Sequence, residues 1–229
     1  MADNSVTILD SIYNQAMSGV GVSESVKKLA EDYLSKSGSL SDKVDSLIRW
    51  QIAKCGTTGF LTGLGGLLTL PVAISADVGV NLYVQIRMAA AIAYMGGYDV
   101  HHDKVKSFVY LTLCGNAMNE VAKKVGIEFA QKIGTNFIKK KISGEFLKKI
   151  NKAVGTKVIT KAGSKGVVNL TKAIPVIGGI IGGAFDAFTT NAVGEAAKRV
   201  FIYNKPPIEL TRYVTEDEVP DWAKDSISD

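Results

Sequence analysis

The stretch that decides the fold is residues 56–98, GTTGFLTGLGGLLTLPVAISADVGVNLYVQIRMAAAIAYMGGY. A glycine-rich apolar run leads to Pro71, a residue that suits the first turn of a helix. From there the apolar spacing predicts one long helix to about Met95. The pair Gly96–Gly97 then signals its C-terminal end.

A second stretch, residues 173–201, has the same make-up: AIPVIGGIIGGAFDAFTTNAVGEAAKRVF. Its glycines form two GxxxG pairs, 178/182 and 179/183, a spacing that lets helix backbones approach closely. Glycine inside a helix costs about 1 kcal/mol relative to alanine, so this repetition predicts tight helix packing. Gly182→Leu and Gly178→Leu are therefore expected to destabilise the protein by overpacking.

The composition favours helices over sheets. Apolar residues make up 46% of the 229 residues and aromatic residues only 8%, so small aliphatic side chains dominate. The strongest strand pattern, residues 156–160, is weak. The predicted fold is all-α, a single globular helical bundle with close-packed Gly-rich helices. We divide it into an N-terminal helical segment (1–40), a helical domain (41–203) and an acidic C-terminal tail (204–229).

Several helix boundaries can be predicted from local signals. Ser23, Ser41 and Asp99 are the expected N-caps of the helices that follow them. One helix is expected from about residue 102 to residue 127. In 151–172 the glycines read as turns and argue against one long helix.

Positive charge gathers in residues 123–172, which hold thirteen lysines, two acidic residues and no arginine. The segment is either a solvated face or a basic surface for an anionic membrane or lipid. The absence of arginine and the apolar flanks argue against nucleic acid as the partner. The lysines expected to contact membrane or anion are Lys132, Lys139, Lys140, Lys141, Lys148 and Lys149.

Polar residues interrupt the apolar helices at a few positions. Asp77, Asn81 and Gln85 follow one another at intervals of four and form one stripe of the predicted helix. They are either hydrogen-bonded inside the bundle or line a small-molecule pocket. The full set of candidates for such a polar pocket is Asp77, Asn81, Gln85, Arg87, Asp186 and Asn191.

No catalytic or metal-binding motif stands out. His101–His102–Asp103 resembles a ligand cluster, but the chain has no other histidine, and the segment fits an exposed first helical turn. The sequence lacks a nucleophile elbow, a Walker loop and a dinucleotide-binding glycine pattern. We therefore expect no metal, no cofactor and no catalytic residue.

The two glycine-rich stretches, residues 70–99 and 174–201, resemble the EcsC family. The matching positions are Pro71, Asp77, Gln85, Arg87, Ile92, Ala93, Gly97, Tyr98 and Asp99, followed by Ile174, Pro175, Gly178 and Gly182. The resemblance covers about residues 45 to 203. It implies an α-helical bacterial protein with a link to membranes, and it implies neither a catalytic residue nor a cofactor.

Three functions stay open at this level. The first is a cytoplasmic protein bound peripherally to the inner face of the cell membrane or to lipid. The second is a pore-forming or membrane-inserting protein, which would use the apolar stretches 55–76 and 173–185. The third is an enzyme or small-molecule binder with an Asp77/Asp186 pocket, and a protein partner is a further alternative. The N-terminus, MADNSVTILD, lacks the pattern of a signal peptide, which favours the cytoplasm.

Overall fold

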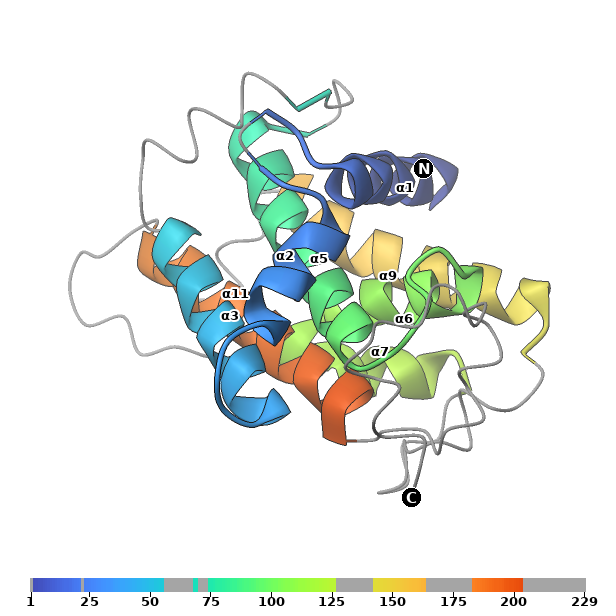
Figure 1. Ribbon diagram of the computed structural model, residues 1–229. Helices are drawn as coiled ribbons and strands as arrows, with labels where there is room; N and C mark the ends of the chain where they lie inside the picture. The colour runs from blue at the N-terminus through green and yellow to red at the C-terminus, as the bar shows by residue number, and fades with distance from the viewer. Residues whose placement is uncertain are drawn as a thin grey trace.

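The computed structural model describes residues 2–21, 23–55, 68–69, 74–126, 142–163 and 183–203. This part of the chain contains eight α-helices and no β-strand, apart from an isolated bridge between Val20 and Ser23 (Figure 1). The all-α prediction is therefore confirmed. The elements are α1 (Ala2–Ser18), α2 (Val26–Leu34), α3 (Leu40–Cys55), α5 (Ala76–Met95), α6 (Asp103–Thr112), the 3₁₀ turn η1 (Gly115–Ala117), α7 (Met118–Lys124), α9 (Gly144–Gly163), α11 (Gly183–Lys198) and the π-helical turn η3 (Arg199–Tyr203).

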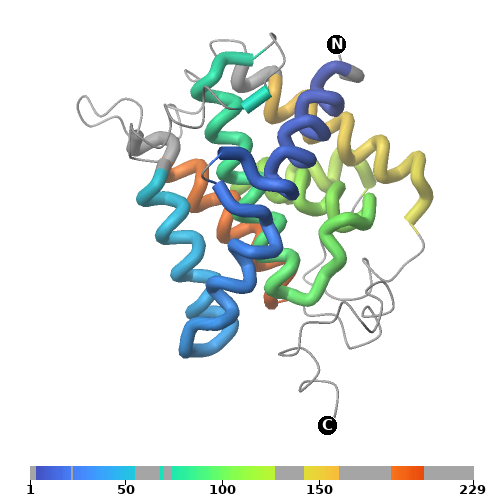
Figure 2. Tube along the Cα trace, turned by 45° about the horizontal axis from the view of Figure 1, so that its top comes forward, coloured from blue at the N-terminus to red at the C-terminus, as the bar shows by residue number. Residues whose placement is uncertain are grey.

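Helix α5 is the centre of the bundle. It packs against α1, α2, α3, α6 and α11, and Figures 1 and 2 both show it running through the middle of these helices. Most of its residues from Gly79 to Met95 are buried, because small side chains such as Ala89 and Ala93 let neighbouring helices approach on every side. The helix ends at Gly96 as predicted. It begins at Ala76, however, since Ile74 and Ser75 are not helical.

Within the described residues, α5 alone has the length and hydropathy of a membrane span, with a mean of 1.2 over an 18-residue window. Of that window, 83% is buried inside the fold. Burial of this extent is typical of a core helix, whose apolar surface is covered by other helices. The two Gly-rich segments considered for insertion, 55–76 and 173–185, lie largely outside the described residues, as do Gly178 and Gly182.

The first two helices attach to the same core. In α1, Leu9 and Ile12 are fully buried, as their spacing predicts. Helix α2 is capped by Ser25, whose hydroxyl accepts a hydrogen bond from the Lys28 N–H, so the prediction of Ser23 as the cap was wrong. Ser23 instead accepts a hydrogen bond from the Tyr83 hydroxyl at 3.0 Å, a contact across 60 residues.

Two other predicted caps are also wrong. At α3 the capping residue is Ser39: its hydroxyl donates to Asp42 Oδ2 and accepts from the Asp42 N–H, and the pair forms a capping box. Ser41 lies inside the helix. At α6 the cap is His102, whose Nδ1 accepts from the Lys104 N–H. Asp99 closes the preceding turn by accepting from the His101 N–H.

The predicted helix over residues 102–127 is broken in the structure. Helix α6 ends at Thr112, and η1 separates it from α7. Gly115 has φ +51°, and a Cβ there would lie 3.1 Å from the Cβ of Ala192 in α11. The break therefore sits where α11 passes close to the chain, a contact that local sequence does not encode.

Helix α9 corrects a second prediction. It runs without interruption from Gly144 to Gly163 and passes through Gly155, which had been taken as a turn. A Cβ on Gly155 would lie 3.1 Å from the Cβ of Ser5 in α1. Gly155 is a point of close helix packing, so the absence of a side chain serves α1–α9 contact and not a bend.

Candidate functional site

Part of the predicted polar stripe forms a buried cluster between α5 and α11. Gln85 is buried, and its Nε2 donates to Asn81 Oδ1 at 2.8 Å. The same Nε2 lies 3.4 Å from the hydroxyls of Thr189 and Thr190 on α11. The stripe thus joins two helices that lie more than a hundred residues apart in the chain. A satisfied amide at this place helps to set the register of the two helices.

The other predicted pocket residues lie elsewhere. Asp77 is exposed in the first turn of α5, where a carboxylate favours the positive end of the helix dipole. Asn191 is exposed on α11. Asp186 belongs to α11, but its side chain is outside the described residues. An Asp77/Asp186 pocket therefore stays a prediction, and the described cluster contains amides and hydroxyls only.

Arg87 lies on a different side of α5 and faces α2. Two residues after Gln85, it is turned about 200° around the helix axis. Its side chain is only 3% exposed, and its Nε donates to the carbonyl oxygen of Glu24 at 2.8 Å. Burial lowers the pKa of Arg87, while the field of nearby groups, Tyr83 and Glu24 among them, opposes that shift.

Among the buried polar residues that sequence reasoning missed is Gln51 of α3. It is fully buried, and among the described residues neither its Nε2 nor its Oε1 has a hydrogen-bond partner. Ile48, three residues earlier, lies against Gly194 of α11, so Gln51 faces the same helix interface. Its neighbours Arg49 and Trp50 are exposed, and no local signal separates Gln51 from them.

A groove lined by lysines lies between α7 and α9. Its volume is about 760 Å³. Its lining residues are Val121, Lys124, Val125, Gly126, Lys149, Lys152, Ala153, Thr156 and Lys157. The lysines share the groove with the apolar side chains of Val121, Val125 and Ala153. This combination suits an anion that carries an apolar group.

One carboxylate balances part of this charge. Glu120 accepts from Lys124 at 2.9 Å and lies 3.6 Å from Lys157. These lysines, Lys124 first, hold the pKa of Glu120 below its ordinary value. Among the described residues no carboxylate lies within salt-bridge distance of Lys149 or Lys152, so the groove keeps an excess of positive charge.

The predicted anion-binding lysines can be placed only in part. Lys148 and Lys149 are exposed on α9, and Lys149 lines the groove. Lys132, Lys139, Lys140 and Lys141 lie outside the described residues. Lys124, Lys152 and Lys157 were absent from the predicted set, because only the packing of α7 on α9 shows that they share one groove with Lys149.

A comparison with models of protein families shows which family the chain belongs to. The model of the EcsC protein family matches residues 7–203. The chain belongs to the EcsC protein family. No curated protein matches it, and no solved structure matches it. Gln85 and Arg87 of this EcsC protein are two of the positions that carry the resemblance to the family. Both are buried, and their hydrogen bonds hold α5 to neighbouring parts of the chain.

The described residues of this EcsC protein contain no group of three or more histidine, cysteine or acidic side chains that could hold a metal ion. His101 is exposed, and the Nδ1 of His102 is taken by its capping hydrogen bond. The His101–Asp103 segment is therefore a helix start in this structure. The α7–α9 groove differs from this segment in that four lysines line it together with apolar side chains.

Proposed function

We propose that this EcsC protein associates peripherally with an anionic membrane surface, with the α7–α9 lysine groove receiving a phospholipid headgroup. The single observation that carries the proposal is that four lysines line one groove with apolar side chains, while the carboxylate of Glu120 is paired with two of these lysines. The place of this association is the inner face of the cell membrane, where anionic lipids give a negative surface potential.

The geometry of α9 supports a headgroup at this groove. Lys149 and Lys152 are three residues apart, so their ammonium groups project from one side of the helix. Val125 and Ala153, which are only partly buried, supply apolar surface in the groove for the glycerol region of a lipid. Each lysine near an anionic surface contributes on the order of 1 kcal/mol.

Peripheral binding is favoured over insertion of α5 because of how this helix is used, whereas insertion of 55–76 or 173–185 is left to experiment. This helix has the composition of a membrane span, but its apolar surface packs against other helices of the bundle. Insertion of α5 would require the core to open and expose those partners. Binding through surface lysines leaves the bundle intact.

Vesicle co-sedimentation tests the proposal. The wild-type chain should bind phosphatidylglycerol-containing vesicles at low salt, release at high salt, and ignore phosphatidylcholine vesicles. Lys149→Gln/Lys152→Gln should weaken binding by about 30-fold, from two contributions of roughly 1 kcal/mol. Lys139→Gln/Lys140→Gln/Lys141→Gln tests the lysines outside the described residues in the same way.

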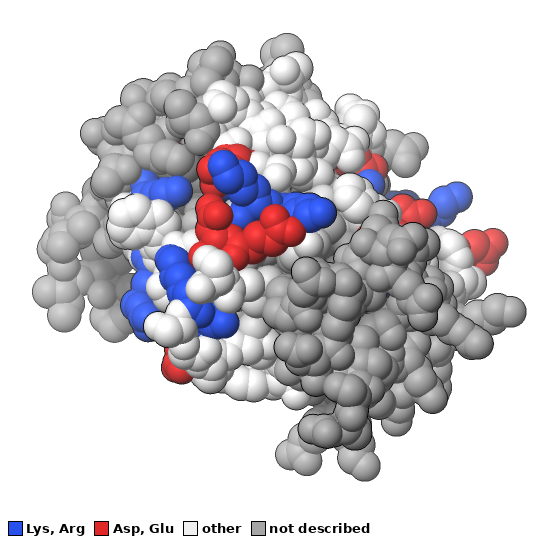
Figure 3. All heavy atoms as spheres, viewed as in Figure 1, with Lys and Arg blue, Asp and Glu red and all other residues white. Residues whose placement is uncertain are grey.

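The matched control is Lys27→Gln/Lys28→Gln on α2, which removes the same charge. These lysines pair with Glu31 and Glu24, and Figure 3 shows acidic and basic side chains interspersed on that face. Equal loss of binding in both double variants would mean that net charge alone acts, and the groove would be rejected. In cell fractions, membrane-bound protein that resists both salt and carbonate washes would indicate insertion.

A further inference from the structure

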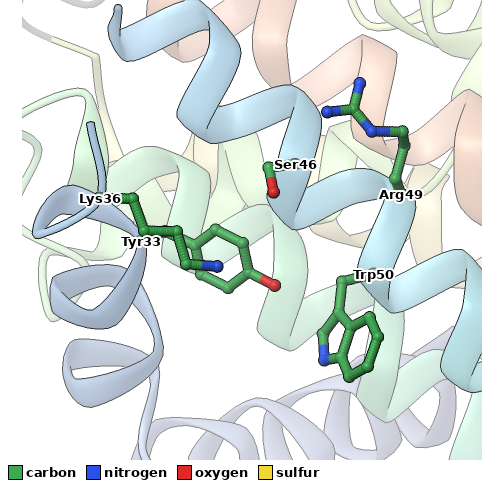
Figure 4. Close-up of a pocket in the computed structure, with 5 residues that line it drawn as sticks. All are labelled: Tyr33, Lys36, Ser46, Arg49 and Trp50. Carbon is green, nitrogen blue, oxygen red and sulfur yellow. The ribbon is translucent and has the colours of Figure 1, made fainter. Parts of the chain in front are cut away.

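A second cavity lies between α2 and α3, away from the lysine groove. Its volume is about 430 Å³, which is within the usual range for small-molecule pockets. Figure 4 shows the five side chains that line it, one from α2, one from the turn that follows α2, and three from α3. They are Tyr33, Lys36, Ser46, Arg49 and Trp50. The cavity thus combines two cations, two aromatic rings and a hydroxyl.

Its aromatic surface is unusually open. The Trp50 side chain is 55% exposed, although tryptophan is a residue type that is mostly buried on average. Lys54 Nζ lies 5.8 Å from the Trp50 ring centroid, and Lys36 Nζ lies 3.5 Å from that of Tyr33. A planar group could cover the exposed indole and gain stacking energy while it stays close to positive charge.

The charge behind the cavity is also positive. Arg87 is buried and has no carboxylate within salt-bridge distance among the described residues, so its charge is balanced only by more distant groups. Burial and, next, the Arg87 charge lower the pKa of Lys54, which places these two cations near each other beside Trp50. Of the two acids whose charge acts on Arg87, Glu24 is paired with Lys28 at 2.7 Å, and Asp32 lies on α2 next to Tyr33. Cations grouped around a partly enclosed cavity concentrate a field that attracts anions.

We infer that the α2–α3 cavity is a binding site for a small anion that carries a planar ring, with nucleoside phosphates as the chemical class. The ring lies against Trp50, and the phosphate is held by Arg49 and Lys36, whose charged donors suit phosphate oxygens. Ser46 adds a neutral hydroxyl donor. This site is independent of the proposed membrane function, because it uses other helices and other cations.

The test uses Trp50 as its own reporter. The chain has two tryptophans, so Trp222→Phe leaves Trp50 as the single tryptophan in the full-length protein, and excitation at about 295 nm selects its fluorescence over that of the tyrosines. Titration with adenosine monophosphate should quench Trp50 in a saturable way. Adenosine alone and inorganic phosphate alone should each bind at least about tenfold more weakly, because each supplies half of the contacts.

Variants locate the site. In the same background, Arg49→Gln should weaken adenosine monophosphate binding by roughly tenfold, the usual size of one charge-assisted hydrogen bond. Lys27→Gln on α2 removes an equal charge without lining the cavity, and it should leave the affinity unchanged. Circular dichroism verifies that both variants are folded.

Three results would overturn the inference. One is the absence of saturable quenching by adenosine monophosphate. Another is equal binding of inorganic phosphate, which would remove any role for the ring. The last is quenching by anionic vesicles without quenching by the nucleotide, which would make Trp50 a membrane contact instead.

Discussion

Gly96 offers the sharpest test of how the helices pack. A Cβ at this position would lie 2.4 Å from the carbonyl oxygen of Phe201 in η3, whereas ordinary contact begins near 3.4 Å. The obstacle is backbone, so Gly96→Ala forces η3 to retreat by about 1 Å in a close-packed interior. That movement also disturbs the edge-on contact between the rings of Tyr98 and Phe201, whose centroids are 5.3 Å apart.

The magnitude follows from this geometry. Overpacking costs about 1–3 kcal/mol, and a clash with backbone belongs at the upper end, near 3 kcal/mol. For a chain of this size the melting temperature should then fall by roughly 6–12 °C. Thermal melts followed by far-UV circular dichroism, with urea unfolding as a second measurement, give both quantities.

Two other glycines serve as controls because they separate steric contact from backbone strain. Gly97 has φ +83° and no atom within 4 Å of a built Cβ, so Gly97→Ala should cost only the strain of a left-handed residue, about 1 kcal/mol. Gly144, at the start of α9, has neither problem, and Gly144→Ala should be neutral or slightly stabilising. If Gly96→Ala and Gly144→Ala have the same melting temperature, η3 does not pack against the end of α5, and the reasoning fails.

Three further predictions concern the core. Gln51→Leu should raise the free energy of unfolding by about 1–2 kcal/mol, because it removes a buried amide that makes no hydrogen bond to the described residues. A lower urea midpoint would show that the variant lost a hydrogen bond. Asp45→Asn should lower the free energy of unfolding by about 2–3 kcal/mol, since the buried Lys198 loses its carboxylate partner. The double variant Asp45→Asn/Lys198→Met should recover most of that free energy. A double variant as unstable as Asp45→Asn would contradict this prediction. Burial raises the pKa of Tyr13 and Tyr110, so their contribution is complete below pH about 10 and is lost as the pH rises further. Absorbance titrations, compared with those of Tyr13→Phe and Tyr110→Phe, should show that these two tyrosines ionise only as helicity is lost. Ionisation of Tyr13 or Tyr110 near pH 10 in an intact fold would refute their burial.

Local sequence was enough to predict the helical class and the end of the central helix. The apolar spacing before Met95 and the pair Gly96–Gly97 act within a few residues, and periodicity and capping are local effects. The buried residues Leu9 and Ile12 of α1 were predicted for the same reason. Caps were harder to predict: Ser39 and Ser41 offer the same hydroxyl, and the choice depends on where the chain turns.

The candidate sites depended on contacts that no local pattern contains. Gln85 meets Thr190 of α11, and Gly155 lies inside a helix because α1 passes beside it. The lysines of α7 and α9 form one groove only once the two helices lie together.

The sequence by itself therefore determined the helical class of the fold, the apolar spacing of its helices and which family the chain resembles. Tertiary structure decided which of its polar and charged side chains meet. The physical reason is that periodicity and capping are settled within one or two turns, whereas the packing of helices distant in the chain sets every contact between them.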